Sequence, residues 1–309
     1  MEILTEGGLQ VCTPLSNREL FFSTIGGMGM TGLIQSAKLR LKKIETSLIN
    51  AKLIKTKNFE EALSIFAESD KKYEYSVTWV DCLAKGKNLG KGIVMLGNHV
   101  SAKDFQGEKN KLDNKWKREI SLPDVFPNWT LNKYSINLFN FAYYNKMLGK
   151  EKNCIMNFDS WFFPLDIIKN WNVLYGKNGF IQYQFVMPFL NGKKGIEEAL
   201  TFLSSKKIGS FLAVLKVVRE DTVLLPFAVS GYTLALDIPI RNKEIFELFN
   251  ELDKIVLKYG GRLYLTKDSR MSKDTFNEMY PCHKQWKETV NKFSPSNLFY
   301  SGLSERLAL

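Results

Sequence analysis

The chain has 309 residues, of which 45% are hydrophobic and 24% are charged, and this composition excludes an intrinsically disordered protein. No apolar run approaches the roughly 18 residues that a membrane span requires, and the first residues lack the basic and apolar segments of a secretory signal. We therefore expect a folded, soluble protein whose default location is the cytoplasm.

The formal net charge is +11. Such an excess favours contact with phosphate groups on nucleic acid, on an anionic membrane surface or on a phosphorylated substrate, although solvated surface lysines alone also explain it. The aromatic residues stand in apolar runs rather than between lysines and arginines, so no nucleic acid is expected as a partner. The four cysteines lie far apart and only two histidines are present, so neither a zinc site nor a disulfide framework is predicted.

A glycine-rich stretch is the first informative feature in chain order. Residues 26–32 contain four glycines between apolar neighbours. Glycine has no Cβ and tolerates positive φ, so this turn either lets the backbone approach a flat ligand or forms an ordinary buried loop. Residues 35–41 then alternate polar and apolar side chains, which predicts a strand.

The segment that follows is expected to pack a helix on a sheet. Residues 58–69 carry apolar side chains at helical spacing, and residues 73–79 alternate as a strand. Residues 92–96 predict a further strand. Residues 101–134 are rich in Lys, Asn and Pro, which indicates an irregular excursion.

The second half of the chain is more regular, and its pattern predicts helices laid on one face of an antiparallel sheet, an α+β arrangement. The expected helices cover residues 165–175, 195–205 and 243–259, and the expected strands cover residues 180–187, 210–218, 232–238 and 262–265.

Read with the glycine-rich stretch, several later segments resemble the flavin-dependent oxidases of the vanillyl-alcohol oxidase type, in particular bacterial members that oxidise a lipid-phosphate-linked sugar. The segments that carry the resemblance are residues 75–81, 122–128, 179–186, 260–270 and 279–307.

This resemblance implies an α+β fold with a partial FAD-binding domain of the PCMH type and a substrate cap domain whose antiparallel sheet is covered by helices. Residues 1–46 correspond to the C-terminal remnant of the FAD-binding domain, residues 47–270 to the cap, and residues 271–309 to a segment that returns to the FAD domain. The family's N-terminal half of that domain has no counterpart in the sequence, which leaves a truncated reading frame, a split-gene product or a fragment as explanations.

The resemblance also assigns a catalytic residue. Lys267 matches a lysine that lies beside the flavin, where it stabilises negative charge or contacts the substrate; the alternative is a solvated lysine paired with Asp268. Tyr264 matches a residue whose ring and hydroxyl lie near both flavin and substrate. The alternative interpretation is a core tyrosine.

Two amides are candidates for binding a sugar. Gln182 and Gln184 alternate with Tyr183, so both project from one face of a strand, where amides can bind several sugar hydroxyls. A solvent-facing polar stripe is the competing interpretation.

The remaining site residues follow from the resemblance. Lys216 interrupts an apolar strand and matches a lysine that faces the substrate, where its charge can meet a phosphate; Thr233 matches a position that lines the pocket. The alternatives are an exposed strand edge and ordinary packing. Gly26, Gly27 and Leu33 match backbone that contacts the cofactor.

Two hypotheses of function therefore stand. The first is an FAD-dependent oxidoreductase, or its C-terminal part, that oxidises a sugar hydroxyl of a polyprenyl-phosphate pentose by hydride transfer to flavin. Its expected partners are the lipid-linked substrate, a separate polypeptide that supplies the missing FAD half, a reductase, and the membrane surface through peripheral contact. The second is an inactive, truncated oxidase cap that acts as a basic protein binding phosphate, lipid or nucleic acid.

Overall fold

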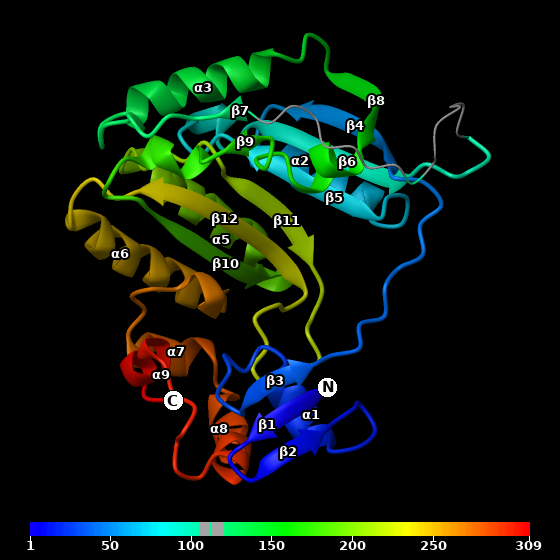
Figure 1. The fold of residues 1–309 in the computed structure, drawn as a ribbon. Helices are drawn as coiled ribbons and strands as arrows, with labels where there is room; N and C mark the ends of the chain where they lie inside the picture. Colours follow the sequence, from blue (N-terminus) through cyan, green and yellow to red (C-terminus); the bar gives the residue numbers. More distant parts are fainter. Residues whose placement is uncertain (105–111, 113–119) are drawn as a thin grey trace.

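The computed structural model describes residues 1–104, 112 and 120–309. Its largest element is an eight-stranded sheet in which every neighbouring pair is antiparallel (Figure 1). None of the helices in these ranges is long and apolar enough to cross a membrane. In sheet order the strands are β13 (Arg262–Leu263), β10 (Phe180–Pro188), β12 (Gly231–Pro239), β11 (Val214–Val218), β5 (Tyr75–Val80), β6 (Gly92–His99), β4 (Leu48–Thr56) and β8 (Glu151–Asn157).

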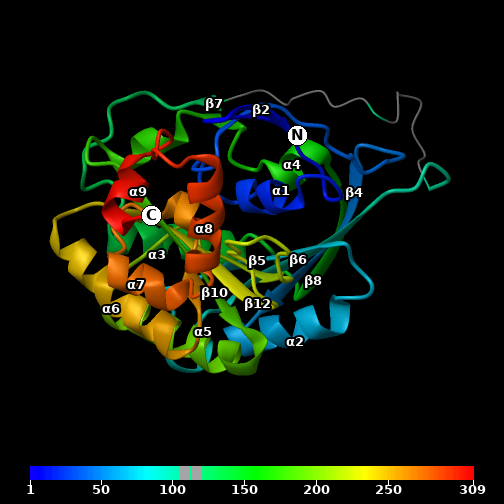
Figure 2. The ribbon, with the colours of Figure 1, turned by 90° about the horizontal axis from the view of Figure 1, so that it is seen from below.

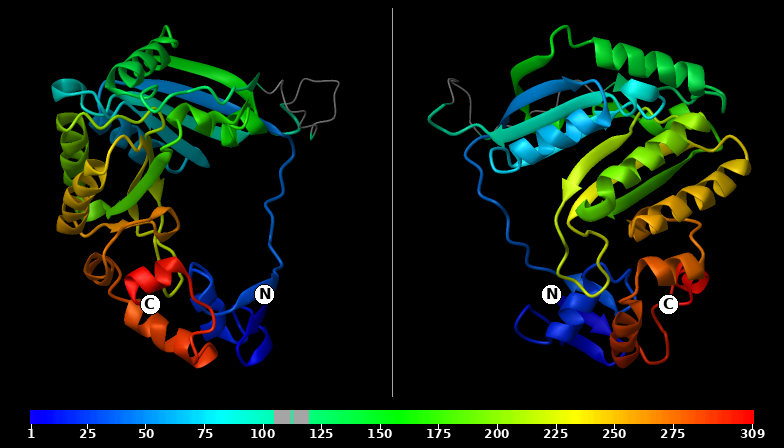
Figure 3. Two further views of the ribbon diagram at one scale, coloured as in Figure 1. Left: turned by 60° about the vertical axis from the view of Figure 1, so that its left-hand side comes forward. Right: turned by 180° about the vertical axis from the view of Figure 1, so that it is seen from behind.

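Three helices cover one face of this sheet, and Figure 3 shows them from behind. They are α2 (Phe59–Ser69), α5 (Phe189–Ser205) and α6 (Glu244–Lys258). The helix α2 begins where the side chain of Asn58 accepts a hydrogen bond from the N–H of Glu61 at 3.0 Å. This cap satisfies one of the free backbone donors of the first turn.

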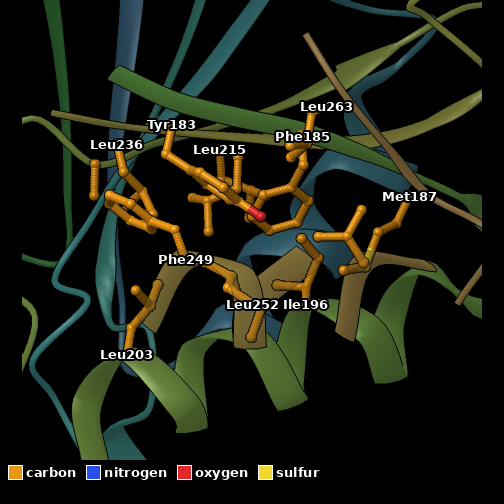
Figure 4. Close-up of a cluster of buried hydrophobic side chains, with 14 of the residues drawn as sticks. Tyr183, Phe185, Met187, Ile196, Leu203, Leu215, Leu236, Phe249, Leu252 and Leu263 are labelled. Atoms are coloured by element: carbon orange, nitrogen blue, oxygen red, sulfur yellow. The ribbon is translucent and has the colours of Figure 1, made fainter. Parts of the chain in front are cut away.

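The main core lies between these helices and the sheet. Tyr183, Phe185 and Met187 of β10 are at most 4% exposed and point toward α5 and α6 (Figure 4). The ring of Phe249 on α6 stacks on Tyr183 with centroids 4.9 Å apart. Because side chains alternate along a strand, the even-numbered residues of β10 face the opposite side.

That opposite face is only partly covered. The helices α3 (Lys133–Asn145) and α4 (Phe158–Phe162) pack over the strands of its far half. The ring of Tyr143 lies 4.7 Å from that of Trp79, and the ring of Tyr75 lies 5.0 Å from that of Phe162. Among the described residues, the end of the face nearest β10 carries no α-helix (Figure 1).

A smaller module unites the two ends of the chain, and Figure 2 shows α1 and α8 side by side. The indole of Trp286 donates to the backbone oxygen of Ser23 at 3.0 Å, and Lys292 pairs with Glu19 at 2.6 Å. Its elements are the antiparallel strands β1 (Glu2–Thr5), β2 (Gly8–Val11) and β3 (Leu33–Ser36), with the helices α1 (Arg18–Thr24) and α8 (His283–Phe293).

The connection between β11 and β12 joins the two parts. It descends to the small module, where the N–H of Leu224 donates to the oxygen of Phe22 at 3.3 Å (Figure 1). The remaining elements are the helices α7 (Lys273–Met279) and α9 (Gly302–Leu307), the 3-10 helices η1 (Gly86–Asn88), η2 (Trp171–Tyr175) and η3 (Leu265–Lys267), and the parallel pair β7 (Ile120–Ser121) and β9 (Ile168–Lys169).

The predicted α+β class is confirmed. The helices were expected on one face of the antiparallel sheet, but α3 and α4 also cover part of the other face. The helices expected at 58–69 and 243–259 are present, as are strands within residues 73–80, 92–99, 180–188, 210–218 and 231–239. Part of the predicted excursion at 101–134 lies outside the described residues.

Three local predictions were wrong. The strand expected at 35–41 is β3, which begins at Leu33 and ends at Ser36. The helix expected at 165–175 is instead a turn, the short strand β9 and, after Asn170 with its left-handed φ of 58°, the 3-10 helix η2. The strand expected at 262–265 ends at Leu263 and continues as a 3-10 turn. The helix expected at 195–205 is present as part of α5, which begins earlier, at Phe189. Gly195 allows α5 to pack closely on the sheet, since a Cβ there would lie 2.1 Å from the sulfur of Met187.

A buried ion pair anchors the segment that follows β13. The guanidinium of Arg270 lies 2.5 Å from the carboxylate of Asp253 on α6, and the two side chains are only 9% and 5% exposed. The hydroxyl of Tyr183 donates to the same carboxylate at 2.7 Å. One carboxylate thus ties α6, β10 and the turn that carries Lys267.

We expect Arg270→Met to lower the free energy of unfolding by about 3–5 kcal/mol, because it leaves the Asp253 charge buried without its partner. Urea denaturation measures this loss. The matched control is Arg219→Met, which breaks the pair with Asp70 whose side chains are 79% and 49% exposed, and should change stability by about 1 kcal/mol or less. Equal, small losses for both variants would show that the buried pair has no anchoring role.

Candidate active site

The site begins as a narrow recess at the uncovered end of the sheet face. Gln182 and Gln184 of β10 line it on one side, and Tyr264 and Lys267 of the turn after β13 line it on the other. Its volume is about 10 Å³, which is room for about one water molecule. The N–H of Tyr264 donates to the oxygen of Gln184 at 2.9 Å, and the N–H of Lys267 donates to the oxygen of Tyr264 at 3.0 Å. Two backbone hydrogen bonds therefore hold the turn against the strand.

Both amides are oriented by residues of the neighbouring strand β12. The Gln182 amide donates to the carboxylate of Asp237 at 3.0 Å, and the Gln184 amide donates to the hydroxyl of Thr233 at 3.2 Å. Thr233 is itself fixed, since its hydroxyl donates to the backbone oxygen of Phe185 at 2.8 Å. Each amide keeps a carbonyl oxygen and a second N–H for a ligand.

A larger cavity of about 440 Å³ adjoins this recess, and Gln184 and Tyr264 line both. Its opposite wall comes from Gly26 in the glycine-rich turn and from the connection between β11 and β12, where Phe227 packs on Tyr264 with ring centroids 4.5 Å apart. The amide-bearing strand therefore faces the glycine-rich turn across one hollow.

The glycine-rich turn has little room for side chains. A Cβ on Gly27 would lie 2.0 Å from the oxygen of Ser23 and 3.2 Å from the indole nitrogen of Trp286. Gly26 has φ +73°, and a Cβ there would point at the oxygen of Leu225, 3.5 Å away. Glycine is needed at residue 27 for packing and at residue 26 for backbone conformation.

Lys267 has a free ammonium group. Its side chain is exposed, and it makes no hydrogen bond or ion pair with any residue in the described ranges. Asp268 pairs instead with Arg306 at 2.8 Å, so the alternative in which Lys267 pairs with Asp268 is wrong. A positive charge without a partner at the mouth of a polar recess favours an anionic or strongly polar ligand.

Lys216 lies on the same face two strands away from β10. It stands opposite Thr233 in the register of β11 and β12. Desolvation lowers the pKa of Lys216, and no acidic side chain of the described residues pairs with it. The strand therefore presents a second unpaired ammonium group toward the site.

Three of the predicted site residues have no side chain that is free to contact a ligand in the hollow. Leu33 lies on β3 of the small module and is 59% exposed. Gly27 packs behind the turn, against α1 and α8, and the hydroxyl of Thr233 is held by the backbone and by Gln184. Thr233 thus orients an amide.

Asp237 is a site residue that the sequence analysis missed. It is 8% exposed and opposes Gln182 in the register of β10 and β12. Burial raises the pKa of Asp237, while the hydrogen bond from Gln182 and the charge of Lys267 lower it in part. An acidic residue inside the apolar strand 231–239 was the signal that could have revealed it.

Tyr175 was missed as well. It is 1% exposed and its hydroxyl has no hydrogen-bond partner among the described residues. Its ring stacks on Phe180, which shares the face of Gln182, with centroids 4.3 Å apart. Burial and, secondarily, the charge of Asp237 raise the pKa of Tyr175, which places a buried hydroxyl near the polar end of the sheet.

These features define an α+β protein with a polar binding recess at one end of a helix-backed antiparallel sheet. The chain is 32% identical over its full length to decaprenylphosphoryl-β-D-ribose oxidase of Mycolicibacterium smegmatis and covers 68% of that protein. Over 94% of its length it is 23% identical to an uncharacterized protein in the mprA 5′ region of Streptomyces coelicolor, of which it covers 81%. No protein-family model matches the chain. The chain belongs to the family of decaprenylphosphoryl-β-D-ribose oxidase, which confirms the resemblance to oxidases of lipid-linked sugars.

The raised pKa of Asp237 predicts a pH-dependent stability difference. The native state binds this proton more tightly than the unfolded state, so stability falls as pH rises from about 3.8 through the native pKa. Asp237→Asn removes this loss, since the new amide oxygen still accepts from Gln182. Urea denaturation should therefore give the variant the larger free energy of unfolding at pH 7. That advantage should shrink as the pH approaches 3.8, and an advantage that grows on acidification would contradict the assignment.

Proposed function

We propose that this chain is an FAD-dependent oxidoreductase, or the C-terminal part of one, that oxidises a sugar hydroxyl of a polyprenyl-phosphate pentose. The observation that carries the proposal is the position of Gln184 and Tyr264. They line the small recess together with Gln182 and Lys267, and they also line the larger cavity whose far wall includes Gly26 of the glycine-rich turn. The family relationship supports the oxidation, and the name of the relative supports the class of substrate.

The residues of this hollow fit one side of a flavin. The cavity of about 440 Å³ has room for a flat ring system, and a Cβ on Gly26 would intrude on that space toward Leu225. Tyr264 and Phe227 supply an aromatic wall. FAD, when bound, supplies the acceptor for the hydride that leaves the carbinol carbon. In this proposal Gly26 and Tyr264 contact the cofactor, with Gly27 shaping the turn and the backbone of Leu33 reaching the adenine side.

In this proposal the polar residues have different roles toward the sugar. Gln182 and Gln184 bind hydroxyl groups through their free carbonyl and N–H groups and thereby orient the ring. Lys267 stabilises the negative charge that develops on the reacting oxygen as its proton leaves. Asp237 holds Gln182 in place, and Lys216 binds the phosphate that links the sugar to its lipid.

The small module presents an apolar surface that a protein partner could cover. Leu9, Val11 and Leu33 lie on one face of its strands, and each is more than half exposed. We include in the proposal a second polypeptide that binds this surface and completes the FAD domain. In this proposal residues 1–46 and 271–309 belong to the FAD domain, and residues 47–270 form the cap.

We expect Lys267→Ala to lower kcat by about a hundredfold or more in the flavin-loaded assembly, because the charge acts on the reacting oxygen. Bound flavin, measured by its visible absorbance, should remain near the level of the unmodified protein. Lys273→Ala, which removes an exposed lysine at the start of α7, is the control and should leave turnover unchanged. Normal turnover in Lys267→Ala, or a purified assembly without flavin absorbance, would refute the proposed function.

Gln184→Ala should raise the KM for the lipid-linked sugar about tenfold or more while flavin content changes little, because the amide binds substrate hydroxyls. Steady-state kinetics with parallel absorbance spectra measure both quantities. Gln285→Ala removes an amide on α8, away from the recess, and serves as the control. An unchanged KM in Gln184→Ala would remove this residue from substrate binding.

A further inference from the structure

A second cavity lies at the other end of the same sheet face. Its volume is about 540 Å³, within the range of about 300–1,000 Å³ that ligand pockets occupy. It lies where the end of α3 crosses the strands β6, β4 and β8. Its apolar lining comes from Leu53, Ile93, Met95, Met147, Leu148 and Met156.

A row of side chains connects this cavity with the polar recess. Leu215 pairs with Thr78, so the next pair in that register places Lys216 opposite Val77. Val77 pairs with Met95, and Met95 pairs with Leu53 in the cavity wall. Directly opposed residues of antiparallel strands share one face, so the row runs without a change of side.

The row is open to a ligand along its length. Val77, Met95 and Leu53 are each only half-buried, whereas Trp79, in the adjacent row, is 4% exposed beneath α3. From β11 to β4 the row crosses three strand spacings, about 14 Å in total. A hydrocarbon chain of several five-carbon units can span this distance and still extend into the cavity.

The charges along the row suit an anionic lipid with its head at the recess. Lys216 stands at the recess end, and Lys146 and Lys152 stand at the cavity. Flexible methionine side chains between them adapt to an irregular hydrocarbon such as a branched chain. Glu151 is the acidic side chain among the described residues that line the cavity, and it pairs with Lys52 at 2.7 Å. At the recess, Asp237 accepts a hydrogen bond from Gln182.

We propose that this cavity and the row leading to it bind the isoprenoid chain of the substrate, with its phosphate at Lys216 and its sugar at Gln182 and Gln184. The inference rests on the proposed function for the identity of the lipid. In this proposal the isoprenoid lies several strands away from the reacting hydroxyl. The lipid therefore adds binding energy without entering the polar recess.

Binding of geranylgeranyl phosphate and of isopentenyl phosphate to the full chain tests this site by titration calorimetry, with the longer probe kept below its micelle concentration. Met156→Asp places a charge in the cavity and should weaken binding of geranylgeranyl phosphate about tenfold or more. The matched control is Ile155→Asp on the opposite face of the same strand, where Ile155 is 57% exposed, and it should bind like the unmodified protein. Isopentenyl phosphate is too short to reach the cavity, so its affinity should not change in either variant.

Leu53→Trp provides a second variant that fills the cavity without adding charge, and it should also weaken binding of the long probe alone. The inference would be overturned if a folded Met156→Asp or Leu53→Trp protein bound geranylgeranyl phosphate with unchanged affinity, or if Ile155→Asp weakened binding equally. Either result would leave the kinetic roles of Lys267 and Gln184 intact. The converse result, long-chain binding that depends on Met156 in a protein without oxidase activity, would remove the proposed function and retain the lipid site.

Discussion

Arg270 and Asp253 form an ion pair that is buried at the junction of α6, β10 and the turn after β13. Such a pair is a costly way to add stability, because desolvation offsets most of the attraction between the charges. Its effect here is one of position. With Arg270 held at one end and Tyr264 bonded to Gln184 at the other, the turn between them has little freedom to move, and Lys267 stays beside the amides.

The two faces of the large sheet have different roles: one forms the core and the other carries polar side chains. One face is filled by apolar contacts with α2, α5 and α6 (Figure 1, Figure 4). The other face carries the amides of Gln182 and Gln184, each of which donates one hydrogen bond to β12. In the part of the chain that the structure describes, Gln182 and Gln184 each use one amide N–H, so their carbonyl oxygens and second N–H groups are available for further hydrogen bonds. The same alternation that fills the core therefore prepares the binding face.

The glycine-rich turn acquires its role through contacts with residues far away in the chain. Trp286 packs behind Gly27, and the connection from β11 brings Leu225 and Phe227 opposite Gly26. The first and last segments of the chain thus build one wall of the hollow together, and β10 with the turn after β13 builds the other. Neither wall makes a cavity alone, which explains why the turn by itself was compatible with an ordinary loop.

The sequence by itself determined the properties that depend on neighbours in the chain: the helices α2 and α6, most strands of the large sheet, and the common face of Gln182 and Gln184. The family resemblance selected Lys267. Only the tertiary structure decided that Lys267 stands on a 3-10 turn, that Asp237 orients Gln182, and that Asp268 pairs with Arg306. The periodicity of a sequence indicates toward which face of its own helix or strand a side chain points. These three features depend instead on contacts between segments that are tens of residues apart, and local spacing contains no information about such contacts.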